Sequence, residues 1–314
     1  SCLMHALVGL MASGGSTNHT IHWVSVARAA GYLIDWTDLE TISSVTPLLT
    51  RVYPNGTEDV NAFQAAGGTA GLLSTLMDGG FVDGDALTVW GTTMANTVAE
   101  VLPTAETFST RKPGASRNTE VLRPHTNAFQ PDGGIRLMKG NLGRGVCKVS
   151  AVKPEHRFVE APCRVFTDQH QVIDAFNKGE LTEPVVVVLA HQGPRANGMP
   201  ELHKLTPILG ILQDQGLSVA LVTDGRMSGA SGKVLSAIHV CPEAKADGPI
   251  SRLRDGDMVR VDANEGVLHT TADLSVREPM PTPAQAVSHG RGYFQVWRNT
   301  VSSAEEGASN LFPQ

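Results

Sequence analysis

The stretch 223–232, with the sequence TDGRMSGASG, holds the residues with the clearest potential for chemistry. It follows an apolar run of the β-strand type at 217–222 and precedes a segment, 233–239, for which we predict a helix. A strand that ends in a glycine-rich turn presents polar groups to a ligand. Ser228 lies between glycines, and Arg226 supplies a positive charge that suits a carboxylate or helps a hydroxyl to ionise. The spacing fits equally an ordinary turn with a capping serine and a surface arginine.

A second polar stretch, SGGSTNHTIHW at 13–23, joins two helical patterns. Its glycines end the first helix, and Ser16, Thr17 or Asn18 can cap the next one, which continues to about residue 30. A helix N-terminus that is rich in hydroxyl and amide groups suits an anion. A plain helix-Gly-Gly-helix junction explains the same residues, and the two histidines of this stretch are not by themselves a metal site.

Two further stretches carry charged residues next to predicted strands. The sequence HQGPRANGMPEL at 191–202 leaves an apolar strand at 184–190, where ligand sites collect, and Glu201 is predicted to open a helix. A glutamate there is ordinarily a first-turn residue favoured by the helix dipole. The sequence GNLGR ends at Arg144 and reads as a hairpin turn with an exposed arginine.

Composition narrows the class of protein. The chain has 314 residues, 41% hydrophobic and 18% charged, as in a globular protein with an ample core. Its net charge of −6 argues against a nucleic-acid partner, and no apolar run is long enough to span a membrane. The four cysteines form no C-x-x-C pair, so neither a disulfide framework nor a self-contained zinc site is expected. A cytoplasmic location is the simplest interpretation.

The order of helical and strand patterns along the sequence predicts two domains, 1–120 and 121–314. The chain begins inside a helical pattern, which we interpret as a fragment whose first half is missing. Residues 35–110 look mostly helical, and the proline-rich segment 103–131 is the predicted boundary. Short strands split by glycine turns then favour a β-barrel, with a last helix at about 283–301.

Five motifs resemble one family and follow its order along the chain. They are GGSTNHTIH, HQGPRANGMPELHKL, TDGRMSGASGK, AIHVCPEA and RLRDGDMVRVD. The family joins dihydroxy-acid dehydratase and 6-phosphogluconate dehydratase, and RVYPNG and FQAAGG resemble its phosphogluconate branch. The resemblance implies an α/β fold, in which the C-terminal part of a layered α/β domain precedes a β-barrel like the swivelling domain of aconitase.

The resemblance also implies roles for particular residues. Ser228 would be the base that removes the proton next to the substrate carboxylate, with Arg226 beside it as a catalytic residue. Glu201 would bind Mg²⁺, the other protein ligands coming from the missing half. Substrate-binding residues would be Ser16, Thr17, Asn18, Arg144 and Arg195, the two arginines being candidates for a substrate phosphate. Lys148, Lys204 and Lys233 remain open alternatives for that phosphate.

The implied activity is that of a hydro-lyase in the Entner–Doudoroff pathway, converting 6-phosphogluconate to 2-keto-3-deoxy-6-phosphogluconate. The partner is then a small sugar-acid phosphate, and the full-length enzyme is expected to be a homodimer. An iron–sulfur cluster is implied, with its ligands in the missing N-terminal half. The chain alone is therefore expected to be colourless, free of iron and inactive.

Three alternatives compete with this interpretation. The first is a sister dehydratase that acts on a branched dihydroxy acid or an unphosphorylated sugar acid. The second is a sugar-acid-binding module without catalysis, and the third is a structural fragment that has lost both activities.

Overall fold

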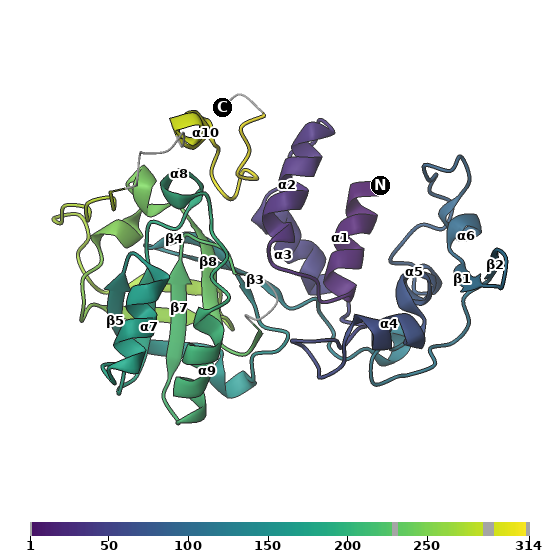
Figure 1. The fold of residues 1–314 in the computed structure, drawn as a ribbon, viewed down its shortest axis with the longest axis horizontal. Helices are drawn as coiled ribbons and strands as arrows, with labels where there is room; N and C mark the ends of the chain where they lie inside the picture. The colour runs from purple at the N-terminus through teal and green to yellow at the C-terminus, as the bar shows by residue number, and fades with distance from the viewer. Residues whose placement is uncertain (1, 228–231, 285–291, 312–314) are drawn as a thin grey trace. The chain divides into compact units, whose positions relative to one another are not determined.

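The computed structural model describes residues 2–227, 232–284 and 292–311, which fall into two compact units. The first unit comprises 1–15 and 39–134, and the second comprises 16–38 and 135–314 (Figure 1). The second unit therefore takes the polar stretch after Gly15 together with the C-terminal part of the chain. The predicted domain boundary after residue 120 stays a prediction, because a family domain need not end where a compact unit ends.

The first unit is mainly helical. Its core includes Leu49, Leu72, Leu76 and Val121. The carboxylate of Asp59 caps the helix at Val60–Ala66 by accepting hydrogen bonds from the backbone N–H groups of Asn61 and Ala62. Its elements are α1 (Cys2–Ala12), most of α3 (Trp36–Val45), α4 (Val60–Ala66), α5 (Gly68–Asp78), α6 (Met94–Thr97), β1 (Glu100–Pro103), β2 (Phe108–Arg111) and η1 (His125–Asn127).

The prediction that residues 35–110 are mostly helical is wrong at the end of this range, where β1 and β2 form an antiparallel hairpin. Glu100 is 7% exposed and its carboxylate binds the guanidinium groups of Arg111 and Arg117. These ion pairs hold the two strands together and tie them to the following segment. The layered α/β arrangement predicted for this part of the family fold stays a prediction.

The second unit contains a closed barrel of eight strands in the order β10-β3-β4-β8-β7-β6-β5-β9. The barrel predicted from the closely spaced strands is thus confirmed. Strands β5 to β8 are parallel neighbours, and the remaining pairings are antiparallel except for β10 with β3. The strands are β3 (Ile135–Gly140), β4 (Gly143–Lys148), β5 (Phe158–Phe166), β6 (Val185–Leu189), β7 (Val219–Thr223), β8 (Leu235–Cys241), β9 (Met258–Asp262) and β10 (Val267–Thr270).

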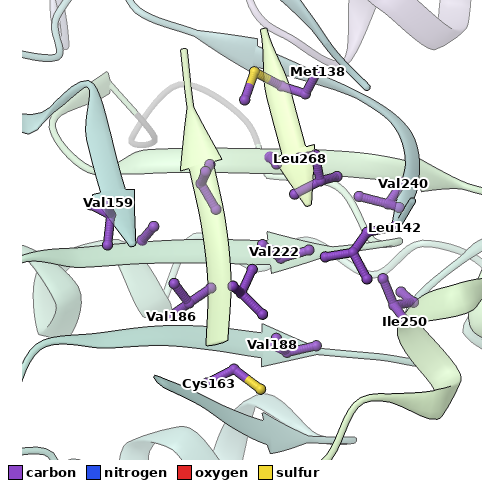
Figure 2. Close-up of a cluster of buried hydrophobic side chains, with 14 of the residues drawn as sticks. Met138, Leu142, Val159, Cys163, Val186, Val188, Val222, Val240, Ile250 and Leu268 are labelled. Carbon is purple, nitrogen blue, oxygen red and sulfur yellow. The ribbon is translucent and has the colours of Figure 1, made fainter. Parts of the chain in front are cut away.

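Branched side chains fill the barrel. Strand β6 has the sequence VVVVL and every residue of it is buried, as is usual for a parallel strand covered on both faces. Figure 2 shows Val186, Val188 and Val222 gathered with Leu142 and Leu268 in the core. Cys147 and Cys163 belong to the same cluster. The interior of the barrel is therefore filled with packed side chains.

Short helices surround the barrel. Helix α7 (Gln169–Asn177) contacts β5, and α9 (Leu205–Asp214) contacts β7 (Figure 1). The other helical elements are α2 (His19–Ala29), η2 (Pro154–His156), α8 (Pro194–Asn197), η4 (Ala244–Ala246), η5 (Pro249–Arg252) and α10 (Gly292–Thr300). The predicted last helix, 283–301, overlaps α10, and residues 285–291 of it lie outside the described part of the chain. Among the helices that the structure describes, none has the length and apolar character needed to cross a membrane.

The helix predicted at 233–239 is wrong, because this segment enters strand β8. All seven residues of β8 are buried between β7 and β4. Val240 and Ile238 are β-branched and pack better on a pleated surface than in a helix. Burial on both faces removes the alternation of polar and apolar residues by which an exposed strand is recognised.

Candidate active site

The site lies where the parallel strands β6 and β7 end. The carboxyl ends of parallel strands meet at the same edge of a sheet, where ligand sites collect. Asp224, directly after β7, is fully buried and accepts hydrogen bonds from the backbone N–H groups of Gln192 at 2.8 Å and Ala244 at 2.9 Å. This carboxylate therefore fastens the loops that follow β6, β7 and β8 to one another.

Arg226 and Glu201 face each other at this edge. The distance between Arg226 Nη1 and Glu201 Oε2 is 3.6 Å, and Arg226 Nε donates to the carbonyl of Met199 at 2.6 Å. The two residues also form a parallel β-bridge, reinforced by the hydrogen bond from Leu202 N to Arg226 O. The bridge corrects the prediction that Glu201 opens a helix, since α9 begins only at Leu205. Backbone pairing with the Arg226 turn keeps Glu201 extended.

Residues before α2 reach the same turn. Thr17 Oγ1 donates to the carbonyl of Met227 at 2.7 Å, and Asn18 Nδ2 donates to Glu201 Oε2 at 3.4 Å. Ser16 Oγ accepts from the backbone N–H of Asn18 at 3.3 Å and so shapes the turn. Asn18 occupies the N-cap position of α2, but its side chain makes no capping hydrogen bond. The polar stretch is therefore directed to the Arg226 turn more than to its own helix.

His239 belongs to this cluster and was not predicted as a site residue. It is fully buried within β8 and its backbone has a φ of 60°. Its backbone N–H donates a hydrogen bond to the carbonyl of Gly225 at 2.9 Å. Its Nδ1 lies 3.2 Å from Thr20 Oγ1. Burial, and then the charges of Arg226 and His22, lower the pKa of His239 to about 3, so the ring is neutral. A histidine in the apolar run VLSAIHV was the signal for it.

His22 lies on α2 next to the same charges. Its pKa is lowered by partial burial, then by the positive charges of His19 and Arg226.

A cavity of about 490 Å³, here called the Arg226 cavity, opens beside these residues. Arg226, His22 and Met199 line one part of it, while Trp297, Phe294 and Arg298 of α10 line another. Its volume suits a ligand the size of a small sugar acid. A lining that combines charged and aromatic side chains is typical of a site that orients a polar molecule.

The remaining predicted residues lie in different places. Ser228 lies outside the described residues, directly after Arg226 and Met227 in the sequence. Arg144 donates to both carboxylate oxygens of Glu305, at 2.7 to 3.1 Å, and does not line the Arg226 cavity. Arg195 is on α8, where its Nε donates to the carbonyl of Val301 at 3.1 Å. The structure thus brings Thr17, Asn18, Glu201 and Arg226 together and places the two candidate phosphate ligands elsewhere.

The donors at the Arg226 turn fit part of a magnesium site. Glu201 supplies a carboxylate, and Asn18 Oδ1 is buried without a hydrogen-bond partner among the described residues. Hard oxygen atoms of this kind are the ligands that Mg²⁺ prefers. The described ranges contain no gathering of three or more His, Cys, Asp or Glu side chains that could enclose a metal ion. Among the described residues, Glu201 and Asn18 are therefore the candidate ligands that this turn offers to a magnesium ion.

The cysteines do not fit an iron–sulfur cluster. Burial raises the pKa of Cys147 to about 11, and that of Cys163 and Cys241 to about 12, so these thiols stay protonated. Cys2 is exposed. A cluster needs several thiolates at one place, and the described cysteines do not provide them.

Glu243 gives the second unit a pH-dependent stability. Its pKa is raised from the ordinary 4.5 to about 7 by burial and by the neighbouring Asp224. The folded state thus holds this proton more tightly than the unfolded state, so the stabilisation is complete below about pH 4 and is lost as pH rises through about 7. We expect Glu243→Gln to reduce the fall in the free energy of unfolding between these pH values, as measured by denaturant titration. Asp214→Asn, an exposed change, serves as control, and an unchanged slope in Glu243→Gln would contradict this.

Comparison with models of known protein families identifies the family of this chain. The N-terminal model of the dihydroxy-acid/6-phosphogluconate dehydratases matches residues 1–97, and their C-terminal model matches residues 120–308. The chain therefore belongs to the dihydroxy-acid/6-phosphogluconate dehydratase family, as its motifs indicated.

The chain is similar to individual members of both branches of this family. The chain is 52% identical to the phosphogluconate dehydratase of Pseudomonas aeruginosa over 314 residues, which covers 98% of the chain and 52% of that protein. It is 46% identical to the phosphogluconate dehydratase of Escherichia coli K12, over 98% of the chain and 52% of that protein. Identity to the dihydroxy-acid dehydratase of Sulfurisphaera tokodaii is 34%, over 97% of the chain and 53% of that protein. The chain spans about half the length of the curated relatives it matches.

Proposed function

We propose that the protein to which this chain belongs dehydrates 6-phosphogluconate to 2-keto-3-deoxy-6-phosphogluconate. The observation that carries the proposal is the cluster of Asn18, Glu201 and Arg226, in which Arg226 lines a cavity and stands two residues before Ser228 in the sequence. The higher identity to phosphogluconate dehydratases than to a dihydroxy-acid dehydratase supports the phosphorylated substrate.

In the proposed reaction the substrate carboxylate lies near Arg226 and Ser228 Oγ takes the proton from C2. The electrons of the broken C2–H bond are held first on the carboxylate and then form the C2=C3 bond as the 3-hydroxyl leaves with a proton as water. The resulting enol gains a proton at C3 and loses the proton of its 2-hydroxyl, and so becomes the 2-keto-3-deoxy acid. A serine is a weak base at its ordinary pKa, so the positive charge of Arg226 two residues away supports its ionisation.

We further propose that Glu201, together with Asn18 Oδ1, holds part of a Mg²⁺ site. Magnesium there would stabilise negative charge on the substrate carboxylate as the C2 proton is removed. Glu201 already lies beside Arg226, with 3.6 Å between its Oε2 and Arg226 Nη1, and Arg226 lines the cavity. We propose that the ligands of an iron–sulfur cluster come from outside this chain, because its cysteines do not suit one. The homodimer, the cytoplasmic location and the inactivity of residues 1–314 alone stay predictions from the resemblance.

The substrate is tested with a panel of acids offered to the complete gene product, prepared without oxygen. We expect keto-acid formation from 6-phosphogluconate with a kcat/KM at least about 100-fold above that for gluconate or 2,3-dihydroxy-3-methylbutanoate. A preference for the branched acid would favour the sister dehydratase. Binding of 6-phosphogluconate without turnover would instead favour a sugar-acid-binding module.

A further inference from the structure

A second cavity of the barrel unit, here called the basic pocket, is lined by residues of α8 and α10, as the Arg226 cavity is. Its volume is about 520 Å³. Three positively charged side chains line it and no acidic residue does so among the described residues. Its lining consists of Arg195, Ala196, Lys245, Thr282, Pro283, Gln295, Arg298 and Asn299.

Arg298 connects the two cavities, because it lines both of them. Helix α8 also contributes to both, with Asn197 at the Arg226 cavity and Arg195 at the basic pocket. Arg226 and Arg298 line the same cavity, so a ligand bound there has a guanidinium group available for each of two charged ends. A six-carbon acid that carries charge at both ends is a ligand of this kind.

The guanidinium of Arg298 is available to such a ligand. Within the described part of the chain it makes no hydrogen bond or ion pair, in contrast to Arg144, whose guanidinium is bound to Glu305. Arg195 is anchored through its Nε to the carbonyl of Val301, which holds its side chain at the pocket wall. Lys245 adds a third positive charge from η4.

The chemistry of these groups selects an oxyanion. One planar guanidinium group can donate two parallel hydrogen bonds to a phosphate. A neighbouring ammonium adds positive charge without fixing the orientation of the phosphate. Amide and hydroxyl groups of Gln295, Asn299 and Thr282 are further hydrogen-bond partners for such an anion. Glu243 accepts a hydrogen bond from the backbone N–H of Arg195 at 2.9 Å, and it does not line the pocket.

We propose that the basic pocket receives the phosphate of the sugar-acid substrate, with Arg298 as the residue that distinguishes a phosphorylated from an unphosphorylated acid. The proposal rests on the proposed function for the identity of the substrate. It joins Arg195, already a candidate for the phosphate, with Lys245 and Arg298, and it leaves Arg144 in its ion pair with Glu305.

The experiment replaces Arg298 by glutamine in the complete gene product. The KM for 6-phosphogluconate is expected to rise roughly 10- to 100-fold, the effect of losing a charged hydrogen bond, while kcat changes little. The affinity for gluconate, measured as substrate or competitive inhibitor, is expected to stay unchanged. Arg164→Gln, which removes an arginine from an exposed ion pair outside both cavities, is the matched control. Lys245→Gln gives a second test if Arg298→Gln does not fold.

Two results would overturn the proposal. One is a KM for 6-phosphogluconate within about twofold of wild type in both pocket variants, well below the loss of one charged hydrogen bond. The other is an equal loss of affinity for 6-phosphogluconate and gluconate, which marks a merely structural role.

Inorganic phosphate separates failure of the pocket from failure of the proposed function. We expect it to raise the melting temperature of the wild type and not that of Arg298→Gln. If the wild type does not act on 6-phosphogluconate but shows this difference, the proposed function fails and the anion pocket stands. If phosphate has the same effect on both proteins, or none on either, the pocket assignment is wrong.

Discussion

Ser228→Ala, made in the complete gene product, is expected to lower kcat for 6-phosphogluconate by about 10³-fold, as the loss of a general base does. The reason is the place of Ser228 in the sequence, directly after a turn that Asp224, Thr17 and Glu201 hold in place. Removing one oxygen atom leaves those contacts intact, so KM and the melting temperature are expected to stay near the wild-type values. Steady-state kinetics and thermal unfolding measure the two effects.

Ser275→Ala is the matched control for this change. Ser275 is an exposed serine of the same unit whose hydroxyl donates to Asp273 at 2.6 Å, far from any predicted chemistry. Its kinetics should match the wild type. A Ser228→Ala enzyme that keeps more than about a tenth of wild-type kcat, a loss below ~1.4 kcal/mol of transition-state stabilisation, would remove Ser228 from the role of base.

Glu201→Gln is expected to lower kcat by about 10²- to 10³-fold, the size of losing one preorganised electrostatic contact in an active site. The change keeps the shape of the side chain but removes the negative charge that faces Arg226 and that would hold Mg²⁺. The Mg²⁺ concentration for half-maximal activity should rise in the same variant. Activity measured against MgCl₂ concentration records both quantities.

Glu180→Gln tests whether that loss is specific. Glu180 forms an exposed ion pair with Arg164, and exposed pairs contribute little to stability. We expect it to behave as wild type. If Glu201→Gln kept its Mg²⁺ dependence and most of its kcat, Glu201 would be an ordinary partner of Arg226 and no metal ligand.

Local patterns in the sequence predicted those parts of the fold that depend on residues close together along the chain. The apolar run before Ala190 and the short strands between glycine turns indicated the barrel. Strand β8 was mistaken for a helix because both its faces are buried and its sequence shows no alternation. Glu201 was misplaced at a helix start because its partner, Arg226, comes much later in the chain.

Contacts between distant residues account for the features of the site that sequence reasoning missed. Thr17 meets Met227, and Thr20 meets His239, across more than two hundred positions. Nothing in the spacing of one segment reveals such a partner. Arg298 was not considered at all, because only the packing of α10 near α8 brings it to both cavities. The motifs indicated which segments matter, and the barrel determines which of their side chains meet.

The most direct test of the proposed reaction is the hydrogen content of its product. The complete gene product is incubated with 6-phosphogluconate in D₂O, and the product is followed by ¹H NMR. Removal of the C2 proton, loss of the 3-hydroxyl and protonation of the enol at C3 predict 2-keto-3-deoxy-6-phosphogluconate with one deuterium at C3. Unchanged 6-phosphogluconate, or a keto acid whose C3 carries no deuterium, would contradict the proposed dehydration.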